Sequence, residues 1–180
     1  MEYQYFICDV FTKYKFSGNQ LVVFPNAQGL SDWQMQSIAK EFNFSEATFV
    51  FPSEHGNTRK VRIYTPTIEV PFAGHPNIGT AFALANQGMF GDLNEGVNIV
   101  FEEEAGRVPI KIQKDDSGDI WCELGAPEAL SIGVAVNKEL VGSVLSLNES
   151  EILTTTHPPQ VASVGLPFLF VELPSDAVLK

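Results

Sequence analysis

Short runs of apolar and β-branched residues, separated by turn-forming residues, recur along most of the chain and predict strands. They occupy residues 3–11, 21–24, 43–51, 61–65, 97–101, 107–112, 119–124 and 167–171. The turns Glu104–Gly106 and Asp115–Gly118 join the three runs between residues 97 and 124, which favours an antiparallel meander with a solvated hairpin tip. The acidic run Glu102–Glu104 is expected to be a solvated strand end.

Apolar residues recur at helical spacing in three other segments. The first helix follows an N-cap at Ser31–Asp32, the second starts at Pro76 and stops before Gly88, and the third runs from about Lys138 to Leu145. The apolar stripe of the first is Met35, Ile38, Ala39 and Phe42, and that of the second is Ile78, Ala81, Phe82 and Ala85. The break at Gly125–Pro127 is the predicted boundary between two parts of the chain.

The start of the second helix has the features of an anion site. Gly74, His75 and Pro76 follow a predicted strand, and proline is favoured at the first helical position because its missing N–H is not needed there. The free amides of the first turn then face a negative group. At this positive end of the helix dipole a neutral His75 ring is favoured, able to donate to a substrate carboxylate or carbonyl. A buried histidine that only caps the helix is the alternative.

Glu46 is the candidate acid–base residue. It lies where the first helix gives way to a strand, with Phe44 and Phe49 close in sequence. Apolar surroundings disfavour the charged carboxylate and raise its pKa, so that it can take and return a proton near neutral pH. A surface glutamate, or one that caps a turn, is the alternative.

Charge and composition narrow the classes of partner. The chain has 180 residues, 44% of them hydrophobic, and a formal net charge of −11. It can therefore bury a substantial core, and its charge argues against binding nucleic acid or an anionic membrane, although a small anion could bind locally. We find no signal peptide and no apolar run of membrane-spanning length, so a cytoplasmic location is the expectation.

Other catalytic chemistries have less support. Cys8 and Cys122 each lie in a strand-like segment, which suits buried residues, although a two-cysteine racemase is an alternative. His55 and His157 resemble loop residues, and neither they nor His75 has the partner spacing of a zinc site. The glycine-rich loops of nucleotide-binding enzymes and the nucleophile elbow of hydrolases are missing from the sequence.

Several stretches, taken in order, resemble the phenazine-biosynthesis isomerase family, the PhzF-like proteins. They are Asp9–Thr12, Phe16–Asn19, Met35–Ala39, Phe44–Phe49 and Thr65–Pro76. The resemblance covers residues 1 to about 124, and Gly165–Phe168 resembles the start of a later family segment. The sequence departs from the family at three positions. Gln20 stands where the family commonly has proline, and Ala47 and Asn77 stand where it commonly has threonine. These differences leave the identity of the substrate open.

The resemblance implies the α+β fold of diaminopimelate epimerase. Two similar lobes enclose the active site, and in each a curved, mostly antiparallel sheet wraps around one central helix. Residues 1–124 would form a complete first lobe, and residues 125–180 part of a second. Family chains continue past the position of Lys180 through a second central helix and a Gly-rich motif, so we expect this chain to be truncated and to hold one wall of the cleft.

The resemblance also assigns roles to individual residues. Glu46 and His75 would be catalytic, with Glu46 as the general acid–base residue, and Asn19, Ser45, Gly74 and His75 would contact the substrate. The implied reaction is proton transfer between carbons of a small cyclic or amino-acid-like carboxylate, with neither cofactor nor metal. A homodimer is expected. The alternative is a catalytically incomplete protein that binds small anions or assembles with other chains.

Overall fold

The chain separates into two compact units, residues 1–125 and 126–180, each described separately below. The computed structural model describes residues 2–126, 128–164 and 167–179. Pro127 of the predicted boundary, Gly165 and Leu166 of the later family segment, and Lys180 lie outside these ranges. In the described part of the chain, no helix has the length and apolar character needed to cross a bilayer.

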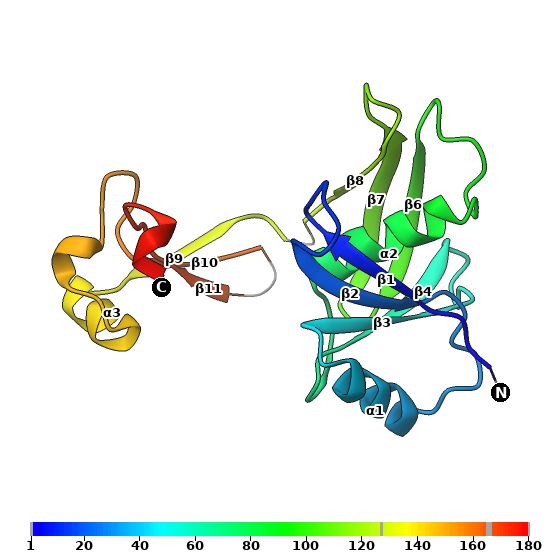
Figure 1. The fold of residues 1–180 in the computed structure, drawn as a ribbon, viewed down its shortest axis with the longest axis horizontal. Helices are drawn as coiled ribbons and strands as arrows, with labels where there is room; N and C mark the ends of the chain where they lie inside the picture. Colours follow the sequence, from blue (N-terminus) through cyan, green and yellow to red (C-terminus); the bar gives the residue numbers. More distant parts are fainter. Residues whose placement is uncertain (1, 127, 165–166, 180) are drawn as a thin grey trace. The chain divides into compact units, whose positions relative to one another are not determined.

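An eight-stranded sheet forms the frame of unit 1 (Figure 1). Its strands are β1 (Phe6–Val10), β2 (Asn19–Phe24), β3 (Glu46–Phe51), β4 (Arg59–Tyr64), β5 (Glu69–Val70), β6 (Val97–Glu103), β7 (Gly106–Lys114) and β8 (Ile120–Leu124). Their order is β1-β2-β3-β4-β6-β7-β8, with β5 beside β4. The pairs β2–β3 and β4–β6 are parallel, and the others are antiparallel. The mostly antiparallel sheet and its meander β6–β8 are therefore confirmed.

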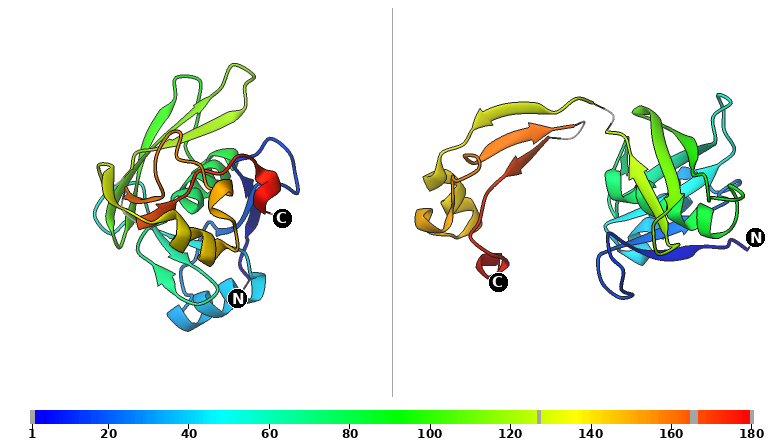
Figure 2. Two further views of the ribbon diagram at one scale, coloured as in Figure 1. Left: turned by 90° about the vertical axis from the view of Figure 1, so that its left-hand side faces the viewer. Right: turned by 90° about the horizontal axis from the view of Figure 1, so that it is seen from above.

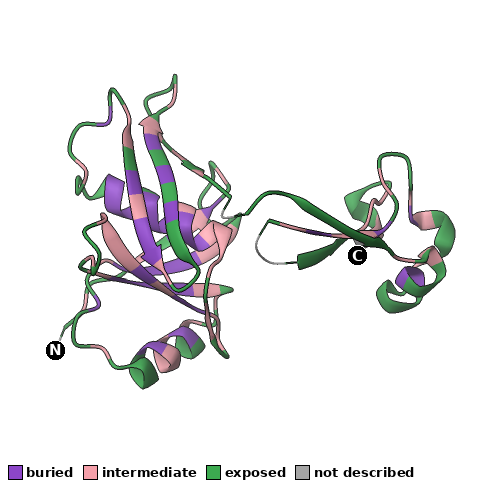
Figure 3. Ribbon diagram, turned by 180° about the vertical axis from the view of Figure 1, so that it is seen from behind, coloured by how far each residue is buried: buried purple, intermediate pink, exposed green. Residues whose placement is uncertain are grey.

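Helix α2 (Gly74–Asn86) lies at the centre of unit 1. It packs against β1 and β2 at one end of the sheet and against β7 and β8 at the other, so the sheet curls around it. Most of the helix is buried (Figure 3). Its small residues allow the helix to pack close to the strands of the sheet. A Cβ added at Gly79 would lie 2.6 Å from Cδ2 of Leu21. The predicted central helix around which the sheet curves is confirmed.

Two details of the predicted second helix are wrong. The helix begins at Gly74, two residues before Pro76, because every N–H in a first helical turn lacks an intrahelical partner and proline is tolerated throughout that turn. Phe82 is 40% exposed although it was placed in the apolar stripe. Ala81 and Ala85 of the predicted stripe are buried, and other positions around the helix are buried as well, since a helix enclosed by a sheet has more than one buried face.

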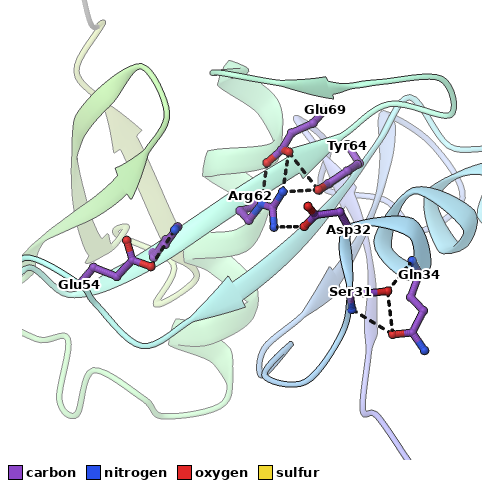
Figure 4. A network of polar contacts seen from close by, with 8 residues as sticks. Ser31, Asp32, Gln34, Glu54, Arg62, Tyr64 and Glu69 are labelled. Atoms are coloured by element: carbon purple, nitrogen blue, oxygen red, sulfur yellow. Dashed lines mark hydrogen bonds and ion pairs between the residues drawn. The ribbon is translucent and has the colours of Figure 1, made fainter.

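Helix α1 (Asp32–Phe42) packs on the other face of the sheet, over a second apolar cluster. Ser31 and Gln34 form a capping box at its start, and Asn43 ends it in the left-handed conformation, as Figure 4 shows for the cap. Arg62 of β4 links the layers, because it binds Glu69 through two nitrogens and Asp32 through a third (Figure 4). The predicted first helix and its cap are confirmed.

The expectation of a solvated strand end holds for Glu104, which is exposed, but is wrong for Glu102 and for the buried carboxyl group of Glu103. Glu102 is only 6% exposed. Its carboxylate accepts five hydrogen bonds, from the backbone N–H groups and side chains of residues 53–57. Burial raises the pKa of Glu102, but these donors together outweigh it and hold the pKa well below its usual range. The sequence pattern did not reveal these partners because they lie on a distant loop.

Unit 2 is a small three-stranded sheet with a helix (Figure 2). It contains β9 (Ser131–Ala135), α3 (Lys138–Leu145), a short 3₁₀ turn at Glu149–Glu151, β10 (Gln160–Ser163), β11 (Pro167–Phe170) and a second 3₁₀ turn at Asp176–Leu179. Strand β10 lies between the other two and pairs antiparallel with both. Every residue of β9 and β11 is exposed (Figure 3). The predicted helix at 138–145 and the strand at 167 are confirmed.

Candidate active site

Glu46 and His75 come together on the inner side of the curled sheet. Glu46 is the first residue of β3, and His75 is the second residue of α2. Nδ1 of His75 lies 3.3 Å from Oε2 of Glu46, and their side chains are 9% and 19% exposed. Two residues far apart in the sequence thus come into contact. Neither Glu46 Oε2 nor His75 Nε2 has a hydrogen-bond partner among the described residues.

Strand parity explains which way Glu46 points. Residues two apart on a strand share a face, so Glu46 lies on the same face as Thr48 and Val50, and Val50 belongs to the core around α2. Phe49 and Phe44 belong to the cluster on the α1 side. The expectation that these two phenylalanines desolvate Glu46 is therefore wrong. Burial does raise the pKa of Glu46, but the cause is the packing around α2.

Burial acts on His75 in the opposite direction. It lowers the pKa of the imidazole, and a hydrogen bond with the Gln20 backbone raises that pKa by a smaller amount. The ring is therefore neutral near pH 7, where one nitrogen donates and the other accepts. Burial thus shifts the pKa of Glu46 upward and that of His75 downward, in both cases toward the uncharged form.

Three further predicted site residues lie next to this contact. Ser45 directly precedes Glu46, Gly74 directly precedes His75, and Asn19 is hydrogen-bonded to Ser45. The Ser45 hydroxyl donates to Oδ1 of Asn19 at 2.9 Å, which joins the residue before β3 to the first residue of β2. Gly74 begins α2, and Ala73, its N-cap, provides no side-chain hydrogen bond to the helix. The first amides of α2 consequently lack an internal acceptor, which is the arrangement that binds a carboxylate.

The two cysteines do not have the character of catalytic thiols. Cys8 and Cys122 are free. Burial, with a contribution from Asp9, raises the pKa of Cys8 to about 11, and burial raises the pKa of Cys122 to about 12. Since the thiolate is the nucleophile, both groups are unreactive near neutral pH. The two-cysteine racemase alternative therefore loses its chemical basis, and Cys8 is a buried residue as expected.

The described residues contain no cluster of three or more histidine, cysteine or acidic side chains that could hold a metal ion. His55 lies in an exposed loop, as predicted. The role of Gln20, whose backbone forms a hydrogen bond with His75, was not predicted from the sequence. Its position directly after Asn19 on the same strand was the available signal, since β2 runs parallel beside β3.

Comparison with known proteins gives a consistent result. An uncharacterized isomerase of Mesorhizobium japonicum is 36% identical over 94% of this chain and 55% of its own length. The trans-2,3-dihydro-3-hydroxyanthranilate isomerase of Pseudomonas fluorescens is 32% identical over 99% of this chain and 60% of its own. A solved PhzF-family protein from Bacillus anthracis superposes with a TM-score of 0.85 at 27% identity, covering 99% of this chain and 58% of that one.

This chain therefore spans a little over half the length of the curated relatives it matches. Residues 8–180 match the PhzC-PhzF family model, described as phenazine biosynthesis-like protein. The match includes the strand that carries Glu46 and the helix that carries His75. With the curled sheet, its central helix and the relatives named as isomerases, this match shows that the chain belongs to the PhzF-like isomerase family.

Proposed function

We propose that this chain carries the acid–base residues of an isomerase that moves a proton between two carbons of a small carboxylate, without a cofactor. The Glu46 carboxylate takes a proton from one carbon, the electron pair shifts along the substrate, and the protonated Glu46 returns the proton at a second carbon. Atoms and charge balance without an oxidant or a second substrate. His75 holds the substrate carboxylate or carbonyl by a hydrogen bond.

The observation that carries this proposal is the 3.3 Å contact between Glu46 and His75 at the start of α2. Burial raises the pKa of the Glu46 carboxyl group toward neutral pH, the direction that suits a group that must both take and return a proton. A neutral imidazole beside it can donate a hydrogen bond without competing for the proton that moves. The amides of α2 provide a place for the substrate's negative group.

The name of one relative provides the first substrate to test. That protein is a trans-2,3-dihydro-3-hydroxyanthranilate isomerase, and its substrate is a small cyclic carboxylate. We propose the same chemical class for this chain, extended to amino-acid-like carboxylates, in a homodimeric assembly. A second candidate function, anion binding without turnover, is favoured by the uncapped α2 N-terminus, which needs no acid–base residue to hold a carboxylate.

Solvent-exchange and binding measurements separate these two functions. The chain is incubated with trans-2,3-dihydro-3-hydroxyanthranilate in deuterated water, and deuterium in the recovered compound is measured by mass spectrometry. Binding is measured by calorimetry on the same samples. Exchange that depends on Glu46 supports the isomerase. Binding that is unchanged in Glu46→Gln, without exchange in either protein, would contradict the isomerase and favour the anion-binding function.

A further inference from the structure

Glu103, the last residue of β6, has a buried carboxyl group that the proposed chemistry does not use. Both of its carboxyl oxygens, and Oδ1 of Asn77 in α2, are buried and have no hydrogen-bond partner among the described residues. Each of these oxygens is an acceptor when Glu103 is ionised. Buried acceptors without donors are unfavourable, because they give up hydrogen bonds to water and gain none. A proton on Glu103 would supply the missing donor.

Strand parity places Glu103 on the α2 side of the sheet. Ile99 and Phe101 belong to the core around α2, and Glu103 follows them at the same two-residue spacing. The turn after Glu103 also contacts the segment that leads into α2. There the backbone N–H of Ala105 donates to the Pro71 carbonyl at 3.1 Å. Glu103 therefore lies beside the corner that carries His75.

Asn77 connects Glu103 to that corner. Its Nδ2 donates to the Ala73 carbonyl at 2.9 Å, and Ala73 is the N-cap of α2. This bond uses a donor of the amide and leaves Oδ1, an acceptor, without a partner. The Asn77 amide also lies close enough to the Glu103 carboxyl group for its N–H to lower the pKa of that group, although the two side chains do not meet the geometry of a hydrogen bond.

Two cations near this end of β6, Lys60 and Arg62, are engaged elsewhere. Lys60 pairs with Glu54, and Arg62 pairs with Asp32 and Glu69. His75 is held neutral by burial, which lowers its pKa. The other charged or titratable side chains around the strand end, none of which forms an ion pair with Glu103 within the described ranges, are His55, Glu102, Glu104 and Arg107.

A buried carboxylate without a counter-charge is unfavourable, and the group responds by keeping its proton. Burial accordingly raises the pKa of Glu103 to about 8, against the smaller lowering by Asn77. The unsatisfied acceptors and the missing cation thus point to the same protonation state. Near neutral pH the folded chain contains the acid form.

We propose that Glu103 is a positioning residue of the Glu46–His75 site, held as a neutral carboxylic acid that donates its proton to Oδ1 of Asn77. The hydrogen bonds then run from Glu103 through the Asn77 amide to the Ala73 carbonyl, and they fix the backbone just before Gly74. A neutral acid also keeps negative charge away from the amides that would bind a substrate carboxylate. This last role rests on the proposed function, whereas the protonation of Glu103 does not.

The proposal has a measurable consequence for folding. Glutamate in an unfolded chain releases its proton near pH 4.5, whereas folded Glu103 releases it near pH 8. Between these values the folded state binds one proton more than the unfolded state, so rising pH favours unfolding. The ratio of folded to unfolded chain should fall about tenfold per pH unit relative to a variant without the carboxyl group, and the difference should level off above the folded pKa.

The test combines infrared spectroscopy of the carboxyl C=O stretch with urea unfolding of the 180-residue chain at a series of pH values. At neutral pH we expect the absorption of a neutral carboxyl group in the wild type, still present in Glu46→Gln and lost in the double variant Glu46→Gln/Glu103→Gln. Glu104→Gln removes an exposed carboxyl group on the next residue and is the matched control. It should keep both the absorption and the wild-type pH dependence, while Glu103→Gln loses the tenfold dependence.

Two results would overturn the proposal. One is a wild-type chain without the acid absorption at neutral pH, and the other is the same pH dependence of unfolding in Glu103→Gln and Glu104→Gln. Asn77→Asp tests the partner, because a second carboxyl group facing Glu103 should raise the pH at which the absorption disappears. An unchanged midpoint would exclude Asn77 as the acceptor. The infrared titrations of the wild type and Asn77→Asp decide the matter even if Glu103→Gln does not fold.

Discussion

The hydroxyl oxygens of Thr48 and Thr80 lie 2.8 Å apart in the buried interior and join β3 to α2. Thr48 is on the same face of β3 as Glu46, and Thr80 is on the helix that begins beside His75. This bond therefore ties together the two elements that carry the candidate acid–base pair. Because both threonines are fully buried, neither hydroxyl can turn to water if the other is removed.

Replacing Thr48 should destabilise the chain by leaving the Thr80 hydroxyl unsatisfied, whereas Thr48 keeps the Val22 carbonyl as a partner at 3.5 Å when Thr80 is replaced. We expect Thr48→Val to lower the free energy of unfolding by about 1–3 kcal/mol, the usual cost of a buried hydroxyl without a partner. The double variant Thr48→Val/Thr80→Val should cost less than the sum of the two single changes. Urea unfolding of all four proteins measures the coupling, and strictly additive effects would contradict the importance of this bond.

Gly79 should tolerate no side chain. A Cβ there would lie 2.6 Å from Leu21 Cδ2 and 2.7 Å from Val10 Cγ2, inside the closest approach of the helix to the sheet. Gly79→Ala is expected to destabilise the chain by about 1–3 kcal/mol in urea unfolding, as overpacking of a core does. Phe82→Ala, on the partly exposed side of the same helix, is the comparison variant and should cost less. A Gly79→Ala protein as stable as the wild type would show that α2 can move away from the sheet.

His75 should make folding sensitive to acid. Burial lowers its pKa below the ordinary value of 6.5, so in the interval below pH 6.5 the unfolded chain binds a proton that the folded chain does not. The stability contributed by the neutral ring is present above this interval and is lost as the pH falls through it. Unfolding measured across this interval should show a shallower pH dependence in His75→Gln than in His55→Gln, which removes an exposed loop histidine. Equal slopes would contradict a depressed pKa.

Glu102 should hold the 53–57 loop in place. The backbone N–H groups of Glu54, His55 and Asn57 all donate to its carboxylate, so Glu102→Gln replaces an acceptor oxygen with a donor nitrogen. We expect faster hydrogen–deuterium exchange at these amides, while Glu104→Gln leaves them protected. Lowering the pH below the usual glutamate range should weaken the wild-type loop, because the open loop takes up a proton there while the folded one, with its lowered pKa, does not.

Local pattern predicted most elements of unit 1 but missed β5 there and β9 and β10 in unit 2. The α1 cap at Ser31, the meander from residue 97 and the helix at Lys138 follow from spacing and turn residues close in sequence. The Gly74–Pro76 corner and Glu46 were candidates from the sequence, and their functional roles stay predictions. Their contact was implied only by the family resemblance.

Interactions between distant segments were not predictable in this way. Glu102 accepts hydrogen bonds from a loop more than forty residues earlier, and Glu103 lies close to Asn77 of α2. Neither acid could therefore be distinguished from a solvated one by its neighbours in sequence. The side chains that desolvate Glu46 were also misassigned, because Phe49 lies three residues along the strand and so on the opposite face.

The most direct test of the central claim is solvent deuterium incorporation into trans-2,3-dihydro-3-hydroxyanthranilate by the wild type, Glu46→Gln and Glu41→Gln. Glu41 is an exposed residue of α1 and serves as the matched control. If Glu46 moves the proton, the wild type and Glu41→Gln incorporate deuterium at equal rates, and Glu46→Gln is slower by about 10²–10⁴-fold, the usual contribution of a general acid–base residue. Equal rates in wild type and Glu46→Gln would contradict the assignment.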